Sequence, residues 1–228
     1  MAFATTSVTT GSVTLAALPS GSANDDLVLV LVGSDFGGIS MANANWTQID
    51  VTRSLTNDGH TWSLWWRVID GTEAGKLTWT IGGGSDIVLR AWRFTGRDTS
   101  TPVSAQVWTA ESTGSSPKAL ALTAVTAASG DDVLAIWALD TSTGSGGWTG
   151  GSYTSGYTEI SEDSFNWTSS FAAEQDNVSS GSTGTITGTA TNATDGLGIA
   201  GWLVALKSSG GPGPAAPASG NALFYGSL

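Results

Sequence analysis

Alternation of apolar and polar residues runs through most of the chain and predicts β-strands. The stretch 61–68 places Trp62, Leu64, Trp66 and Val68 on one face and leaves the other face to Thr61, Ser63, Trp65 and Arg67. The run 27–32 is apolar on both faces, so it predicts a central strand that is covered on both sides. Turns rich in Gly, Asp, Asn and Ser separate the strands, and no segment shows a convincing helical period.

The strand pattern occurs twice along the chain, which indicates an internal duplication. Ser12–Asp35 aligns with Ser116–Asp140: each has an apolar strand, a small-residue turn, an Asp-Asp pair and a second apolar strand, with Asp25 placed on Asp131. We therefore expect an all-β fold, a duplicated β-sandwich of jelly-roll or concanavalin-like type with about twelve strands. It should cover residues 1–207 as two repeats, about 5–104 and 105–207, and a single sandwich is favoured because no linker separates the repeats.

The segment after the second repeat has a different composition. Residues 208–221, "SSGGPGPAAPASGN", form a Gly/Pro/Ala tether that cannot build a core, and residues 222–228 read "ALFYGSL". We expect this apolar peptide to bind a neighbouring chain as a plug or an added strand, through Leu223, Phe224, Tyr225 and Leu228. The alternative is a frayed tail that carries a chance aromatic pair.

Composition and charge exclude several classes of function. The net charge is −11 and the pI is about 4.1, which argues against a phosphate-neutralising nucleic-acid surface. Cysteine is absent, so disulfides and thiolate metal sites are excluded. The longest apolar run is too short to span a bilayer, and no signal segment is found. We expect no membrane insertion and no cofactor.

The turn sequences resemble a family of β-sandwich domains found in bacteriophage tail-fibre, head-associated and decoration-type virion proteins. The resemblance rests on "DDLVLVLV", "NWTQI", "WWRVIDGTEAGKLTWT" and "LRAWRFTGRDTSTPV" in the first half. The second half also fits, through "GDDVLAIWALD" and "GWLVALK". It covers about residues 5 to 207. These motifs are turns and not catalytic signatures, so the resemblance implies a virion β-sandwich but no particular site.

Side chains that carry chemistry are few. His60, the single histidine, precedes a strand in a turn without a nucleophile motif, and we interpret it as a loop residue. Glu159 and Glu162 would be the pair for a glycoside hydrolase, but three residues apart on a strand they point to opposite faces. The Asp pairs 25–26 and 131–132 are interpreted as turn caps, with calcium binding as the alternative, and no metal site is predicted.

Three aromatic residues lie outside the expected core pattern and are candidates for glycan or subunit contact: Trp65, Trp148 and Tyr153. We expect a non-enzymatic virion structural protein, made in the host cytoplasm and bound to other virion proteins and to copies of itself as a homo-oligomer. It would serve as a head decoration, minor capsid, tail or fibre component. The alternatives are a carbohydrate-binding module for host attachment and, third, a glycoside hydrolase.

Overall fold

The computed structural model describes residues 3–8, 12–35, 40–54, 60–82, 87–111, 118–141, 149–154, 156–165, 168–191 and 196–210. Within these residues the secondary structure is all β, as expected. The strands are β1 (Phe3–Val8), β2 (Val13–Thr14), β3 (Leu27–Ser34), β4 (Met41–Ala42), β5 (Thr47–Gln48), β6 (Arg53–Ser54), β7 (Thr61–Val68), β8 (Thr78–Ile81), β9 (Ile87–Phe94), β10 (Val103–Glu111), β11 (Lys118–Leu122), β12 (Thr126–Ala127), β13 (Asp132–Thr141), β14 (Thr149–Tyr153), β15 (Thr158–Phe165), β16 (Thr168–Gln175), β17 (Gly181–Ser182), β18 (Ile186–Thr191) and β19 (Gly196–Leu206).

The strand count exceeds the expected twelve because six of these nineteen strands have only two residues. Such short strands pair briefly within long connections, and two residues are too few to produce a recognisable alternation. Longer strands such as β3, β7, β8 and β9 follow the apolar pattern, whereas β14 (TGGSY) and the second part of β15 (SEDSF) lie where that pattern indicates loops.

The two halves of the chain repeat one strand order. The first half has a large sheet β1-β9-β3-β7-β5, with β6 also on β7, and a small sheet β2-β8-β4. The second half has a large sheet β10-β19-β13-β16-β15 and a small sheet β11-β18-β14, with β12-β17 beside it. In each half the chain passes several times between the large and the small sheet, but β5, β6 and β7 stay in the large sheet of the first half, and β15 and β16 stay in the large sheet of the second.

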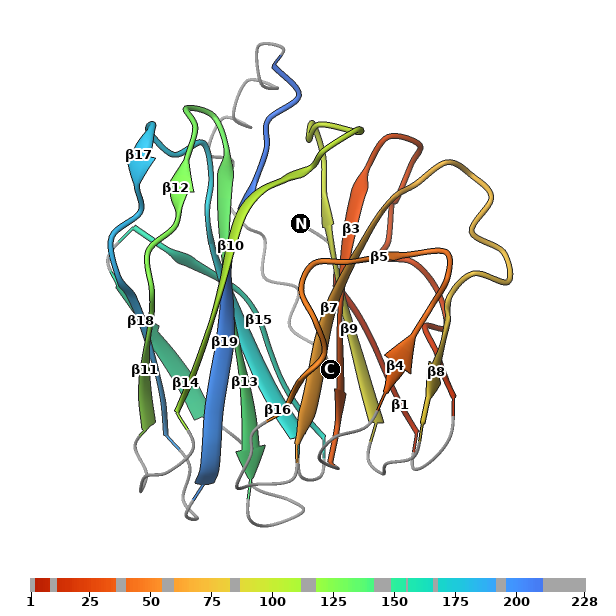
Figure 1. Ribbon diagram of the computed structural model, residues 1–228, viewed down its shortest axis with the longest axis horizontal. Coiled ribbons are helices and arrows are strands. Elements are labelled where there is room, and N and C mark those ends of the chain that lie inside the picture. The colour runs from red at the N-terminus through yellow and green to blue at the C-terminus, as the bar shows by residue number, and fades with distance from the viewer. Residues whose placement is uncertain are drawn as a thin grey trace, which may run out of the picture.

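The four main sheets lie as four layers, small-large-large-small (Figure 1). Three apolar cores separate them. Each outer core fills the space between the small and the large sheet of one half, and the central core joins the two large sheets. This arrangement differs from the single sandwich that the sequence favours, because each half has a small sheet of its own and the halves meet through their large sheets.

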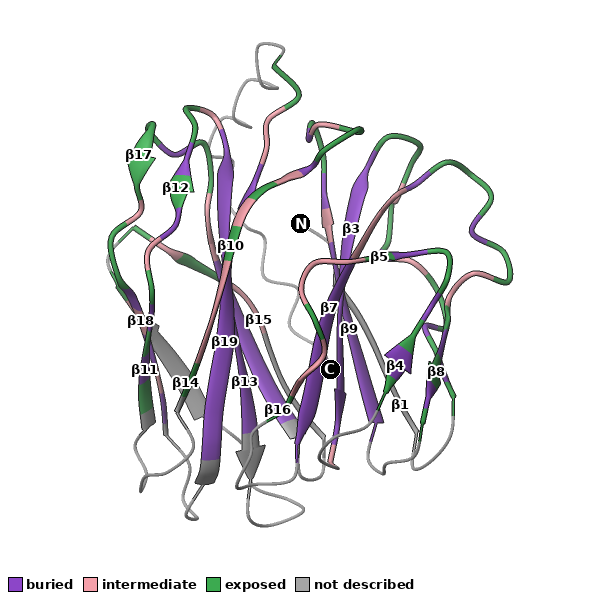
Figure 2. Ribbon diagram, in the orientation of Figure 1, coloured by how far each residue is buried: buried purple, intermediate pink, exposed green. Residues whose placement is uncertain are grey.

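Strand β3 shows how the sequence produces these layers. Leu27, Leu29 and Leu31 enter the central core, while the alternate residues Val28 and Val30 enter the outer core of the first half. All eight residues of β3 are buried, so the prediction of a strand covered on both sides is confirmed (Figure 2). An apolar residue at every position is what a middle layer requires.

Within the described residues no helix is long and apolar enough to cross a membrane.

Candidate functional site

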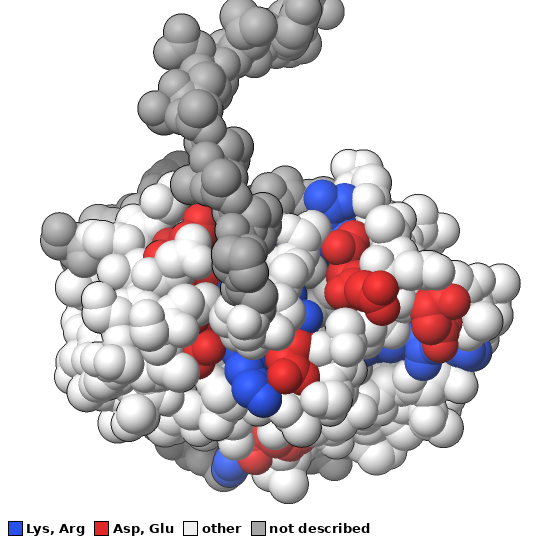
Figure 3. All heavy atoms as spheres, turned by 90° about the horizontal axis from the view of Figure 1, so that it is seen from above, with Lys and Arg blue, Asp and Glu red and all other residues white. Residues whose placement is uncertain are grey.

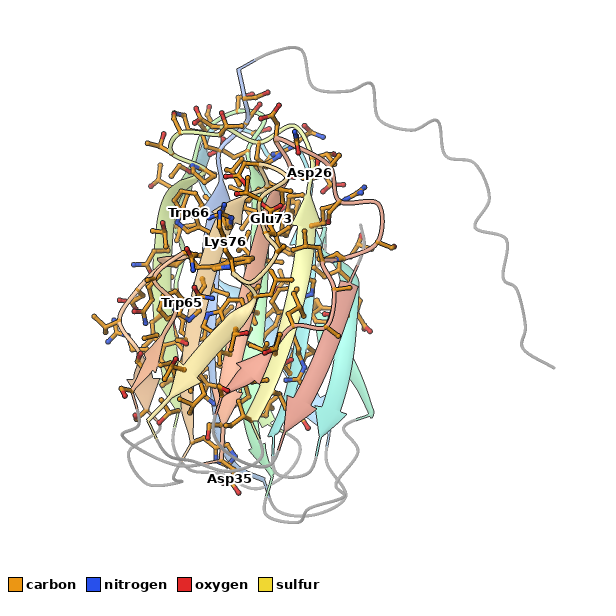
Figure 4. All side chains as sticks on the ribbon, turned by 90° about the vertical axis from the view of Figure 1, so that its right-hand side faces the viewer. Asp26, Asp35, Trp65, Trp66, Glu73 and Lys76 are labelled. Atoms are coloured by element: carbon orange, nitrogen blue, oxygen red, sulfur yellow. The ribbon has the colours of Figure 1, made fainter. Side chains whose placement is uncertain are left out.

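The charged side chains described below lie mostly at one end of the molecule, where β3 and β13 begin and β9 and β19 end. We call it the exit end, because the chain leaves the sheets there after β19. Asp26 and Glu73 lie at this end, and Asp35 lies at the other (Figure 4). Viewed onto the exit end, acidic and basic side chains lie next to one another (Figure 3). The site is therefore built from loops at strand ends.

Two equivalent turns begin the central strands of the two halves. Asp26 Oδ2 accepts a hydrogen bond from the Ala23 amide at 2.8 Å, and Asp131 Oδ2 accepts one from the Ala128 amide at 3.0 Å. The residue before each aspartate has a positive φ, 69° at Asp25 and 88° at the glycine before Asp131. The turn-cap interpretation is confirmed for both aspartates, but the alignment moves by one residue: Asp26, and not Asp25, is the counterpart of Asp131.

The turn after β7 is held by its own side chains. Arg67 donates to Asp70 Oδ2 and to the Asn45 carbonyl, both at 2.8 Å, and Glu73 Oε1 accepts from the Asp70 amide at 2.9 Å. Hydrogen bonds from the Thr72 hydroxyl and amide lower the pKa of Asp70 far below its usual value. The carboxylates here are used in shaping a turn.

Arg97 links the two halves at the exit end. Its side chain is buried, and Nη1 lies 3.0 Å from Asp132 Oδ2, at the first residue of β13. The same guanidinium donates from Nε to the Thr95 carbonyl at 3.1 Å, and Nη1 is 3.4 Å from the Gly130 carbonyl. A buried cation of this kind needs the partners that the two halves jointly supply.

Three carboxylates meet beside this ion pair. Oxygen atoms of Asp132, Glu174 and Asp176 lie within 4.8 Å of one another. Burial, and then the charges of Asp176 and Asp132, raises the pKa of Glu174 to about 9, so this carboxyl is protonated at neutral pH. Burial also raises the pKa of Asp132. Oxygen ligands at this spacing suit a hard cation such as Ca²⁺, but Arg97 already supplies a positive charge to Asp132.

An open groove of about 630 Å³ lies next to the carboxylates, where β15 begins and β16 ends. Its lining is mainly polar and comprises Gly156, Thr158, Glu159, Ile160, Glu174, Gln175 and Asp176. Tyr153 is not one of these lining residues, and its hydroxyl donates to Glu159 Oε2 at 3.0 Å. The Tyr153 ring packs on Trp137 and Phe171, with centroids 5.7 and 5.9 Å away.

The residues predicted to contact a glycan or another subunit have different environments in the structure. Trp65 is buried, with 5 % of its surface exposed, and its indole donates to Ser63 Oγ at 2.7 Å in the outer core of the first half. It has no open ring face, so the expectation of a glycan or subunit contact at Trp65 is corrected. Tyr153 is half-buried and packs against the outer core of the second half. The remaining predicted residues lie outside the described residues: Trp148, Leu223, Phe224, Tyr225 and Leu228.

The other sequence candidates give no shared site. His60 lies outside the strands, directly before β7, as expected of a loop residue; it is buried, and its Nε2 lies 3.4 Å from Asp35 Oδ1. Glu159 pairs with Ala173, which enters the outer core of the second half, whereas Glu174 pairs with Leu134, which enters the central core. The two glutamates of the groove thus leave opposite faces of the sheet, unlike the facing carboxylates of a glycosidase. The side chain of Glu162 lies outside the described residues.

Comparison with known proteins gives no relative: no family model, no curated protein and no solved structure matches this chain.

Proposed function

We propose that the chain is a non-enzymatic structural protein of a bacteriophage particle, exposed as a head decoration, minor capsid, tail or fibre component and bound to the particle through residues 222–228. The observation that carries the proposal is that the described part of the chain exposes almost no large apolar side chain. Among the described residues, Val51 is the single large hydrophobic residue that is exposed, at 60 %. Stable protein contacts need buried apolar anchors. The peptide that includes Leu223 and Phe224 supplies them.

Lys207 and Ser208, at the start of the tether, are fixed to the sheets by hydrogen bonds and an ion pair. The Lys207 amide donates to the Pro102 carbonyl at 2.7 Å, and the Lys207 ammonium lies 3.0 Å from Asp98. The Ser208 amide donates to Asp131 Oδ1 at 3.1 Å. These contacts join Lys207 and Ser208, where the tether begins, to the connection between β9 and β10 and to Asp131 in the second repeat. The start of the tether is therefore attached to both repeats. Such an attachment suits a protein held by its tail.

The family resemblance supports the same proposal. Its motif residues Arg67, Glu73 and Arg97 hold turns at the exit end, and none belongs to a reactive constellation in the described chain.

The test is incorporation into particles produced from the genome that carries this gene. Deletion of residues 211–228 should leave a folded body, because the cores end before Lys207, and reduce incorporation about tenfold or more. A variant with Leu223, Phe224, Tyr225 and Leu228 changed to Ser keeps the tether length and should fail equally. Normal incorporation of either variant would exclude anchoring by the tail, and absence of the wild-type chain from particles would exclude the virion role.

The second candidate function, carbohydrate binding for host attachment, is favoured by the polar groove where β15 begins and β16 ends.

A further inference from the structure

Strand β10 forms an edge of the large sheet of the second half and has one free backbone side. It pairs with β19 over Val103–Glu111, and no other described strand pairs with it. None of the described backbone hydrogen bonds outside the paired strands involves residues 103–111. In Figure 2, β10 is half-buried or exposed, whereas β19 behind it is mainly buried. About half of the amides and carbonyls of an edge strand point away from the sheet, so β10 offers them to a further strand.

The other edge strands of the two large sheets are shorter or charged. Strands β5 and β6 have two residues each, β1 has six, and β15 has the sequence TEISEDSF with three acidic residues. Charged residues and proline on an edge oppose the addition of another strand. Strand β10 has nine residues, VSAQVWTAE, without Lys, Arg or Pro and with its one acidic residue at the end. It is therefore the long edge that the sequence leaves unprotected.

Both faces of β10 carry half-buried apolar side chains. Ala105 and Val107 pack against the outer core of the second half, and Val103 and Trp108 pack against the central core. The rings of Trp108 and Trp202 have centroids 4.2 Å apart. A strand added beside β10 would continue a middle layer, so it would contact apolar side chains on both of its faces, as β3 does.

The sequence of residues 222–228, which lie outside the described residues, has the pattern that such a strand requires. It reads ALFYGSL and begins with four consecutive apolar or aromatic residues instead of an alternating pattern. In an extended strand Leu223 and Tyr225 would share one face, and Phe224 and Leu228 would share the other. Seven residues at about 3.4 Å each span about 24 Å, which is most of the roughly 31 Å that nine residues of an edge strand span.

The direction of β10 favours the tail of a second copy over the tail of the same chain. The Lys207 amide donates to the Pro102 carbonyl at 2.7 Å, so the tether begins beside the residue that precedes β10. A tail that turned back along its own β10 would run parallel to it, whereas every strand pair of this sheet is antiparallel. The tail of another copy can approach from the opposite end and pair antiparallel, which is the more stable arrangement.

We infer that residues 222–228 of one copy bind as an antiparallel strand to the free edge of β10 in a second copy. The inference rests on the proposed function, because it takes this peptide as the anchor of the protein, and it identifies the partner as the same chain. Each copy then has one donor strand and one acceptor edge, so the contact can close as a dimer or as a ring.

The test is the oligomeric state of the purified full chain, measured by sedimentation equilibrium. We expect the chain to self-associate. Both deletion of residues 211–228 and the double variant Gln106→Lys/Ala110→Lys should weaken this association about tenfold or more, because lysine on an edge strand opposes strand addition. Gln106 and Ala110 are exposed, so the variant should still fold. The control Ala44→Lys/Thr80→Lys adds the same charge at exposed positions of the first half and should associate like the wild type.

A mixture of the two defective proteins tests the pairing itself. The chain without residues 211–228 keeps its acceptor edge, and the Gln106→Lys/Ala110→Lys chain keeps its tail, so together they should form a 1:1 complex. Amide hydrogen exchange at residues 103–111 of the tailless chain should slow in this complex.

Three results would overturn the inference: a full chain that is monomeric at every concentration, a tailless chain that self-associates as strongly as the full chain, or no complex in the mixture. The outcome is separate from that of the particle experiment. A chain that enters particles through its tail but stays monomeric in solution retains the proposed function and refutes the inference. A chain that self-associates through β10 but is absent from particles retains the inference and refutes the virion role.

Discussion

Glu174 makes the stability of the protein depend on pH. The folded protein retains its proton up to a pKa of about 9, while the unfolded chain releases it near a pKa of about 4.3. The folded state therefore binds the extra proton between these values, so stability should fall as pH rises from about 4 to 9. Asp132 and Asp176 are the charged side chains beside it, and Arg97 pairs with Asp132.

Glu174→Gln should remove this dependence. At pH 8 we expect the variant to be more stable than the wild type by roughly 1–3 kcal/mol, with the difference vanishing near pH 4. Urea unfolding at a series of pH values measures this, with Glu159→Gln as the exposed control. Parallel pH profiles for wild type and Glu174→Gln would show that Glu174 is ionised in the folded protein.

At the same scale, Trp65 shows how a residue pattern can mislead. The alternation in β7 assigns Trp62 and Leu64 to the core, and this is confirmed. It leaves Trp65 on the other face, which would be open in a two-layer protein. Because β7 belongs to a middle layer, both of its faces are covered. A strand pattern gives the face of a residue, but the number of layers decides its exposure.

Among the elements, the connection between β9 and β10, which carries Arg97, should be the most sensitive to substitution. Arg97→Met leaves Asp132 as a buried charge without its cation and should cost about 3–5 kcal/mol of unfolding free energy. The double variant Arg97→Met/Asp132→Asn has no such charge and should recover part of the loss. Urea denaturation of the two single variants and the double variant measures the coupling. Strictly additive losses would show that the ion pair does not hold the connection.

At the scale of elements, the positions of the strands could be predicted better than the exact alignment of the two repeats. The long strands and the repeat follow from the apolar pattern, but two adjacent aspartates in each repeat allow alignments that differ by one residue. The turn hydrogen bonds of Asp26 and Asp131 resolve the ambiguity. The groove has no sequence signature, because its walls come from two strands and its character depends on how β15 and β16 pair.

For the whole molecule, the central core predicts that neither half is stable alone. It takes Leu27, Leu29 and Leu31 from the first half and Leu134 and Ile136 from the second, all fully buried. Residues 1–104 and 105–210, produced separately, should aggregate or unfold, and together they should form a 1:1 complex. Size-exclusion chromatography with near-UV circular dichroism tests this. Two halves that each unfold cooperatively as monomers would contradict a shared core.

The central claim at this scale is that the body is held on a particle by the segment containing Phe224. The most direct test replaces Phe224 with a photo-crosslinking amino acid in assembled particles and identifies the partner by mass spectrometry. We predict a crosslink to a different virion chain or to another copy of this one, and its loss when Leu223 and Tyr225 are changed to Ser. Crosslinks confined to the same copy's own body, in particles that contain the protein, would contradict the account.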